Sequence, residues 1–172
     1  AFSGHSRGGK TALLAGVLDE RAAIVNTNES GAGGAGCYRL EMTAWDEGNH
    51  LCPNEKLADL LRNFPFWFNP EMAAYVGREE ELPFDEHFLK ALVAPRILLE
   101  TDAASDIWAN PVGSWQTAMA AKEVYRFLGV EDNLLLVYRP GFHEHQPRDL
   151  QTLVNVMKAK IAGEPLCEDA FR

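Results

Sequence analysis

The 172 residues suffice for one domain with a real core, and 47 % of them are hydrophobic, as in globular proteins. The 25 acidic residues outnumber the 16 basic ones, which gives a net charge of -9 at pH 7. This excess argues against a surface for nucleic acid or anionic membrane. No apolar run is long enough to span a bilayer.

The first ten residues carry the strongest motif, Gly4-His5-Ser6-Arg7-Gly8. This G-x-S-x-G pentapeptide is typical of a sharp turn from a strand into a helix, which holds a nucleophilic serine exposed. The flanks agree, because residues 1–3 can end a strand and residues 11–18 are typical of a buried helix. The same pentapeptide also occurs in ordinary glycine-rich turns, so the serine needs partners elsewhere in the chain.

Strands and helices alternate after this motif. The sequence predicts strands at residues 22–27, 96–101 and 133–138, and helices at residues 56–62, 83–93, 113–128 and 151–161. In the helix at residues 83–93 the side chains expected to face inward are Phe84, Phe88, Leu89 and Leu92. The alternation predicts an α/β fold, a three-layer sandwich with a mainly parallel sheet.

Two stretches stand outside this alternation. Residues 28–36 are so rich in glycine that they predict a tight loop with exposed backbone N–H groups. Residues 37–70 are rich in aromatic residues, and we expect them to be irregular to helical. A loop that leaves the carboxyl end of a strand in an open α/β sheet lies where ligands bind.

The three cysteines, Cys37, Cys52 and Cys167, follow no metal-ligand spacing. The odd count leaves at least one thiol unpaired within the chain. A disulfide between Cys37 and Cys52 remains open at this point.

The chain has no initiator methionine and starts on the end of a strand that leads directly into the motif. A nucleophile elbow ordinarily stands in the middle of a parallel sheet, after several earlier strands. We therefore expect residues 1–172 to be the C-terminal portion of a single α/β-hydrolase catalytic domain, without its N-terminal strands. A signal peptide cannot be assessed on this sequence.

Loops at successive strand ends carry a serine, two acids and a histidine: Ser6, then Glu29 and Asp106, then His143. This is the chain order of the α/β hydrolases. A serine hydroxyl needs an imidazole to take its proton, and the imidazole needs a carboxylate to fix its tautomer. Glu29 and Asp106 both remain candidates for the acid, and Asp102 is a weaker third.

Five histidines compete for the role of base. His143 is favoured because it lies nearest the end of its strand, and His145 is the alternative. His5 adjoins the serine, but we expect it to point elsewhere. His50 and His87 both precede the last predicted strand.

Arg7 and Lys10 place two cations beside the serine, three residues apart on one helical face. Such charges indicate an anionic substrate or a developing oxyanion. The alternative is that Lys10 pairs with a surface carboxylate and Arg7 anchors a neighbouring domain.

Together these motifs resemble the glucuronoyl esterases, carbohydrate esterase family 15. The matching stretches are Gly4-His5-Ser6-Arg7-Gly8-Gly9-Lys10, Glu29-Ser30-Gly31-Ala32-Gly33-Gly34, Leu82-Pro83-Phe84-Asp85 with His87, Ala94-Pro95-Arg96, Ile107-Trp108 with Pro111, and Gly141-Phe142-His143 with His145. The likeness runs in order from about residue 3 to about residue 150.

The resemblance implies an α/β-hydrolase that cleaves esters between 4-O-methyl-glucuronic acid on xylan and alcohols of lignin, through an acyl-enzyme. It implies that Ser6 attacks the uronate carbonyl and that His143 acts as general base and then acid. It assigns Glu29 to orient His143, while Asp106 occupies the alternative acid position of some bacterial members.

The resemblance also assigns the substrate contacts. Arg7 would stabilise the oxyanion, Lys10 would hydrogen-bond sugar hydroxyls, and Trp108 would line the sugar pocket. The sugar-binding glutamate of fungal members is not found at its place in residues 63–68, and Glu47 is the candidate substitute.

Two departures give the pattern a bacterial character, because His5 and Gln146 stand where fungal members carry cysteines. The resemblance implies no metal and no cofactor, a glucuronoxylan or lignin–carbohydrate ester as substrate, and a secreted or periplasmic location. It leaves the oligomeric state open. The alternatives are an acetylxylan or other carbohydrate esterase on the same triad, and a catalytically silent hydrolase-like binding module.

Overall fold

A computed structural model describes residues 1–45 and 48–165 of the chain. Its main sheet has four strands, in the order β1 (Phe2–His5), β2 (Ile24–Asn28), β5 (Ile97–Ala103) and β6 (Leu134–Arg139). All neighbouring strands run parallel, so their carboxyl ends meet at one edge of the sheet. This confirms the predicted parallel sheet and brings the predicted strand-end loops to one edge of it.

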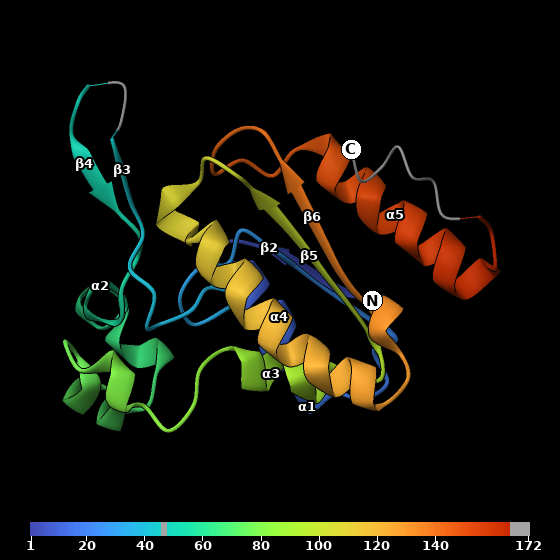
Figure 1. Ribbon diagram of the computed structural model, residues 1–172, viewed down its shortest axis with the longest axis horizontal. Coiled ribbons are helices and arrows are strands. Elements are labelled where there is room, and N and C mark those ends of the chain that lie inside the picture. Colours follow the sequence, from blue (N-terminus) through green and yellow to red (C-terminus); the bar gives the residue numbers. More distant parts are fainter. Residues whose placement is uncertain (46–47, 166–172) are drawn as a thin grey trace.

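Helices cover both faces of the sheet, as Figure 1 shows with the strands between α4 and α5. The α-helices are α1 (Arg7–Leu18), α2 (Leu57–Asn63), α3 (His87–Val93), α4 (Pro111–Phe127) and α5 (Pro147–Ala162). Short 3₁₀ turns lie at Pro65–Trp67, Pro70–Tyr75, Glu79–Glu81, Ile107–Ala109 and Glu131–Asn133. The three-layer α/β sandwich predicted from the sequence is therefore confirmed.

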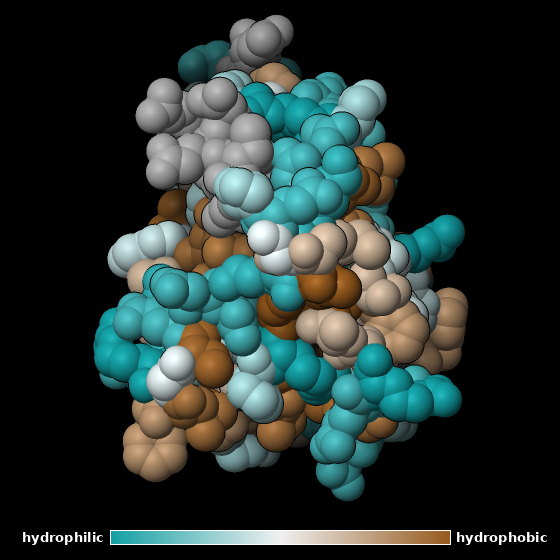
Figure 2. All heavy atoms as spheres, turned by 90° about the vertical axis from the view of Figure 1, so that its right-hand side faces the viewer, coloured by the Kyte–Doolittle hydropathy of each residue, from teal (hydrophilic) through white to brown (hydrophobic). Residues whose placement is uncertain are grey.

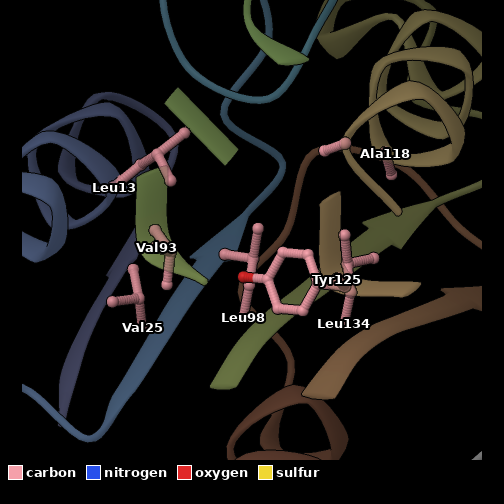
Figure 3. Packing of buried hydrophobic residues seen from close by; sticks show 8 residues of the cluster. Leu13, Val25, Val93, Leu98, Ala118, Tyr125 and Leu134 are labelled. Atoms are coloured by element: carbon pink, nitrogen blue, oxygen red, sulfur yellow. The ribbon is translucent and has the colours of Figure 1, made fainter. Parts of the chain in front are cut away.

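Alternating side chains along the strands divide the core into two layers. On one face, Val25 and Leu98 pack with residues of α1, α3 and α4, among them Leu13 and Tyr125 (Figure 3). On the other face the buried cluster is Ile24, Ile97, Leu99, Val137, Leu153 and Val156. The second cluster holds α5 against the sheet.

The segment between β2 and α3 contains a β-hairpin that the sequence analysis missed. Strands β3 (Thr43–Trp45) and β4 (Leu51–Pro53) pair antiparallel and stand apart from the main sheet (Figure 1). Each has only three residues, too few for a period-two pattern to stand out. Below the hairpin, α2 packs on the glycine-rich loop through Leu57, Leu60 and Ala32.

The prediction for residues 83–93 was partly wrong. The α-helix begins only at His87, and its expected inward residues Phe84, Phe88 and Leu92 are 39 %, 52 % and 59 % exposed. Lys90, a charged residue, is instead fully buried. The helix therefore presents a different face to the core than its hydrophobic pattern indicates.

The disulfide left open by the sequence is not formed. Cys37 and Cys52 are both free thiols, and Cys37 Sγ lies 3.1 Å from Asp85 Oδ2. Burial and this carboxylate raise the pKa of Cys37 to about 11, so its thiol is protonated at neutral pH. Cys167 lies outside the described residues.

Within the described residues, no helix has both the length and the apolar character needed to cross a membrane. The face shown in Figure 2 mixes hydrophilic side chains among hydrophobic ones.

Candidate active site

The nucleophile motif forms the turn between β1 and α1. Ser6 has the positive φ of 57°, and its backbone N–H donates to Asn28 O at 2.8 Å. A Cβ at Gly4 would lie 2.0 Å from Gly8 O, which explains why glycine stands at the first position of the motif. The Arg7 N–H, at the first helical position, is one of the donors that a helix leaves without an internal partner.

Three predicted residues meet at the carboxyl edge of the sheet. His143 Nε2 lies 2.9 Å from Ser6 Oγ, and His143 Nδ1 lies 2.6 Å from Asp106 Oδ2. An ionised carboxylate can only accept, so the proton sits on Nδ1 and leaves Nε2 free to accept from the serine. The hydrogen bond with Asp106 raises the pKa of His143, and burial opposes this rise.

Glu29 lies beside this chain of hydrogen bonds rather than within it. Its Oε2 is 3.6 Å from His143 Nδ1 and has no hydrogen-bond partner, while Oε1 accepts from Arg139 Nη2 at 2.5 Å. Burial raises the pKa of Glu29 to about 8, and the Arg139 guanidinium opposes this rise. In this structure Asp106, and not Glu29, makes the short contact with the imidazole. Asp102, the third candidate, instead accepts from the Glu29 N–H at 3.0 Å.

The expectation that His5 points away from the site was wrong. Its ring centroid lies 4.7 Å from that of His143, and the ring of His145 stacks on it with centroids 5.2 Å apart. Asn28 Oδ1 lies 2.6 Å from His5 Nδ1 and fixes the ring. Burial lowers the pKa of His5, which favours the neutral form of this ring beside His143.

A cavity of about 380 Å³ opens in front of Ser6 and His143. Arg7 and Trp108, two of the predicted substrate contacts, line it. Phe64 and Trp67 add aromatic walls from the segment after α2.

Lys10 lines the same cavity, but its ammonium already has three protein acceptors. Nζ donates to Ser30 O at 2.6 Å, to Ala32 O at 2.5 Å and to Glu55 Oε2 at 2.8 Å. These bonds use all three of its protons. The lysine therefore ties α1 to the glycine-rich loop and to the segment after β4.

Glu55 is a cavity residue that the sequence analysis missed. Its side chain is nearly buried, and its backbone N–H donates to Trp108 O at 2.9 Å. Glu47, the candidate named from the sequence, lies outside the described residues. The structure explains the role of Glu55, because a nearly buried cation such as that of Lys10 needs a carboxylate partner.

Among the described residues, potential metal-ligand atoms of His5, Glu29 and His143 lie within 4.8 Å of one another. Glu29 is already paired with Arg139, and His143 Nδ1 with Asp106. Contacts with other protein side chains therefore explain why these three residues lie close together.

A serine on a strand–turn–helix elbow, followed by an acid and a histidine at the ends of later parallel strands, defines the α/β-hydrolase class. The model of the family described as "Glucuronyl esterase, fungi" matches residues 1–129. The chain belongs to the glucuronoyl esterases, carbohydrate esterase family 15.

Relatives agree over most of the chain. It is 37 % identical to a 4-O-methyl-glucuronoyl methylesterase of Schizophyllum commune, over 98 % of this chain and 42 % of the relative. A family 15 glucuronoyl esterase from Caldicellulosiruptor kristjansonii superposes with a TM-score of 0.87 at 37 % identity, over 95 % of this chain and 43 % of that one.

A third relative is a mutant glucuronoyl esterase from Sporotrichum thermophile, solved in complex with methyl 4-O-methyl-β-D-glucopyranuronate. It superposes with a TM-score of 0.77 at 26 % identity, over 95 % of this chain and 43 % of that one. The chain thus spans less than half the length of each of these three relatives.

Proposed function

We propose that the protein carrying this chain is a carboxylic ester hydrolase that acts on esters of (4-O-methyl-)glucuronic acid, such as those joining glucuronoxylan to lignin alcohols. The observation that carries this proposal is the hydrogen-bonded series from Ser6 through His143 to Asp106, which faces a cavity lined by cations and tryptophan. The relative in complex with a methyl glucuronate ester supports the substrate class.

In the proposed mechanism, Ser6 Oγ attacks the ester carbonyl while its proton passes to His143 Nε2. Asp106 holds the imidazole through Nδ1 and stabilises the imidazolium that forms. The imidazolium then gives its proton to the departing alcohol, which leaves an acyl-enzyme. Water, activated by the same imidazole, releases the uronic acid.

Charge on the carbonyl oxygen needs donors in place before the reaction. We assign this role to Arg7, through its backbone N–H at the start of α1 and its guanidinium, which both belong to the residue next to the nucleophile.

The sugar ring would lie against Trp108, because carbohydrate rings pack on aromatic faces and this indole lines the cavity. Glu55 offers a carboxylate to sugar hydroxyls, and Lys10 supplies its counter-charge. The predicted direct bond from Lys10 to a sugar hydroxyl requires the exchange of one of its three present acceptors.

A substrate in plant cell walls implies action outside the cytoplasm, so we propose a secreted or periplasmic location. Fractionation of cells that express the natural gene tests it, and recovery of the protein only in the cytoplasm would contradict it.

The function is tested by comparing the hydrolysis of benzyl glucuronate and 4-nitrophenyl acetate. We expect turnover of the glucuronate and a loss of at least about 10³-fold in kcat for Ser6→Ala, because no other group on the elbow can form the acyl-enzyme. A matched control is Ser3→Ala, on β1 three residues before Ser6, which should keep full activity.

Each other outcome has a distinct reading. Turnover of the acetate alone would replace the proposal with an acetylxylan or other carbohydrate esterase. Turnover of neither ester would favour a catalytically silent binding module. Full activity of Ser6→Ala would overturn the mechanism.

A further inference from the structure

Arg139 is the last residue of β6 and is only 2 % exposed. Its backbone lies in register with Ala103 of β5, and its carbonyl accepts from Ala104 N at 2.8 Å. Ser105 N donates to Gly141 O at 3.2 Å, two residues further along. The loop that ends in Asp106 is thus fastened to the start of the His143 loop (residues 140–146).

The buried guanidinium of Arg139 binds backbone carbonyls of the His143 loop. Nη1 donates to Pro140 O at 3.3 Å and to Phe142 O at 3.4 Å, and Nη2 donates to Glu144 O. The carbonyls on both sides of His143 therefore bind the same side chain.

Two carboxylates hold this guanidinium in place. Nη2 donates to Glu29 Oε1 at 2.5 Å, and Nε donates to Asp149 Oδ1 at 3.0 Å. Asp149 Oδ2 also accepts from Gln146 N at 2.9 Å. The set of hydrogen bonds made by the Arg139 guanidinium, called the brace below, therefore extends to the start of α5. A planar fork of five donors suits such a junction, whereas a lysine ammonium has only three.

The contact with Glu29 also decides where its carboxylate lies. With Oε1 held by Arg139, Oε2 stays 3.6 Å from His143 Nδ1, and the place at 2.6 Å belongs to Asp106. The same contact supplies a positive charge to a carboxylate that is buried next to a second acid.

Resting on the proposed function, we propose that Arg139 is the positioning residue of the active site: it fixes the His143 loop and withholds Glu29, so that Asp106 orients the imidazole. It touches neither Ser6 nor the cavity, so it acts through His143 and not on the substrate.

The test compares Arg139→Met and Arg139→Lys with a matched control, Arg96→Met. The Arg96 guanidinium also binds backbone carbonyls, those of Gly16, Asp19, Ala22 and Leu92, but Arg96 lies just before the amino end of β5. The readouts are kcat and KM for benzyl glucuronate, the rate at which a fluorophosphonate labels Ser6, and Tm.

For Arg139→Met we expect kcat and the labelling rate to fall by at least about 10-fold with KM within about 2-fold, because only the serine–histidine unit is misplaced. Arg139→Lys should recover part of both rates. Arg96→Met should keep both rates within about 2-fold even where its Tm falls.

Wild-type rates in a folded Arg139→Met protein would overturn the proposal, and so would an equal loss in Arg96→Met. If Arg139→Met does not fold, Asp149→Asn tests the proposal instead. This substitution weakens the hydrogen bond from Arg139 Nε and keeps the arginine. It should slow labelling several-fold, and an unchanged rate would again overturn the proposal. Labelling needs no glucuronate, so it stays informative if the proposed substrate is wrong.

Discussion

Two buried acids stand within reach of one imidazole, and their partners separate their roles. Asp106 has His143 Nδ1 at 2.6 Å, whereas Glu29 is engaged by Arg139. Burial also raises the pKa of Glu29 to about 8, so at neutral pH this group has less charge than Asp106 to offer an imidazolium. The geometry therefore favours Asp106 as the acid of the triad.

Amide substitutions at these two acids should have unequal effects. Asp106→Asn should lower kcat by about 10²-fold or more, because an amide can donate to the imidazole and favour the wrong tautomer. Glu29→Gln keeps an oxygen acceptor for Arg139 and should cost less than about 10-fold. The measurement is kcat for benzyl glucuronate, and the reverse order of losses would assign the triad acid to Glu29.

The pH dependence of kcat/KM gives an independent check on the same contact. The general base works as neutral imidazole, so activity is lost as pH falls through the pKa of His143. Asp106 raises that pKa, and Asp106→Asn should therefore move the acid limb of the profile to lower pH. A limb that does not move would show that Asp106 does not act on His143.

The serine and histidine of the site could be predicted from residue type and chain order, but the residues that hold the site together could not. Ser6 and His143 follow the ends of predicted strands, so their residue types and positions were enough to predict a nucleophile and its base. Glu55 and Arg139 become meaningful only through partners 45 and 110 positions away, Lys10 and Glu29. Nothing local in the sequence marks such pairs.

At the scale of elements, the packing of α1 on β2 depends on glycine. An added Cβ at Gly16 would lie 2.2 Å from Val25 Cγ2, whereas one at Gly8, in the same helix, would meet nothing within 4 Å. The close approach of helix and strand therefore depends on Gly16 and not on Gly8. Gly9 is crowded as well, since its added Cβ would lie 3.0 Å from Thr27 Oγ1 of β2.

Gly16→Ala should destabilise the fold by about 1–3 kcal/mol, because overpacking forces helix and strand apart. Gly8→Ala, the matched control, should change the free energy of unfolding by less than about 1 kcal/mol. Urea unfolding measures both. Equal stability of the two variants would mean that α1 does not rest on β2 as described.

The helix that was misjudged, α3, shows why hydrophobic pattern alone fails there. Lys90 is buried because Glu100 of β5 lies 2.8 Å from its Nζ and Ser114 O accepts a second proton. Just before the helix, Asp85 accepts from Tyr38 N at 3.1 Å and holds the turn. Polar partners from distant elements override the apolar face.

Across the described part of the molecule, four buried carboxyls resist ionisation. Burial raises the pKa of Glu29 and Glu86 to about 8, of Glu100 to about 7 and of Asp102 to about 6. In the unfolded chain such groups ionise near their ordinary values, so the folded state binds more protons between those limits. Their contribution to stability is complete at low pH and is lost as pH rises.

Thermal unfolding should therefore show Tm falling by about 5 °C or more from pH 5 to pH 8. Glu86→Gln should flatten this slope, since Glu86 lies outside the triad and its amide cannot ionise. Glu41→Gln, an exposed carboxylate, serves as control and should leave the slope unchanged. A Tm that rises over this range would contradict the assignment.

Activity and stability thus respond to pH in opposite directions. Rising pH favours the neutral, active form of His143, whereas falling pH keeps the buried carboxyls protonated and so stabilises the fold. The protein should work within a window bounded by its chemistry on the acid side and by its fold on the alkaline side.

The aromatic walls of the cavity have one more consequence. Two of the four tryptophans, Trp67 and Trp108, line it, while Trp45 and Trp115 lie exposed elsewhere. Indole emission responds to the polarity of its surroundings, so the molecule carries an intrinsic optical reporter of an occupied cavity. The binding of ligands that are not hydrolysed can therefore be measured by tryptophan fluorescence.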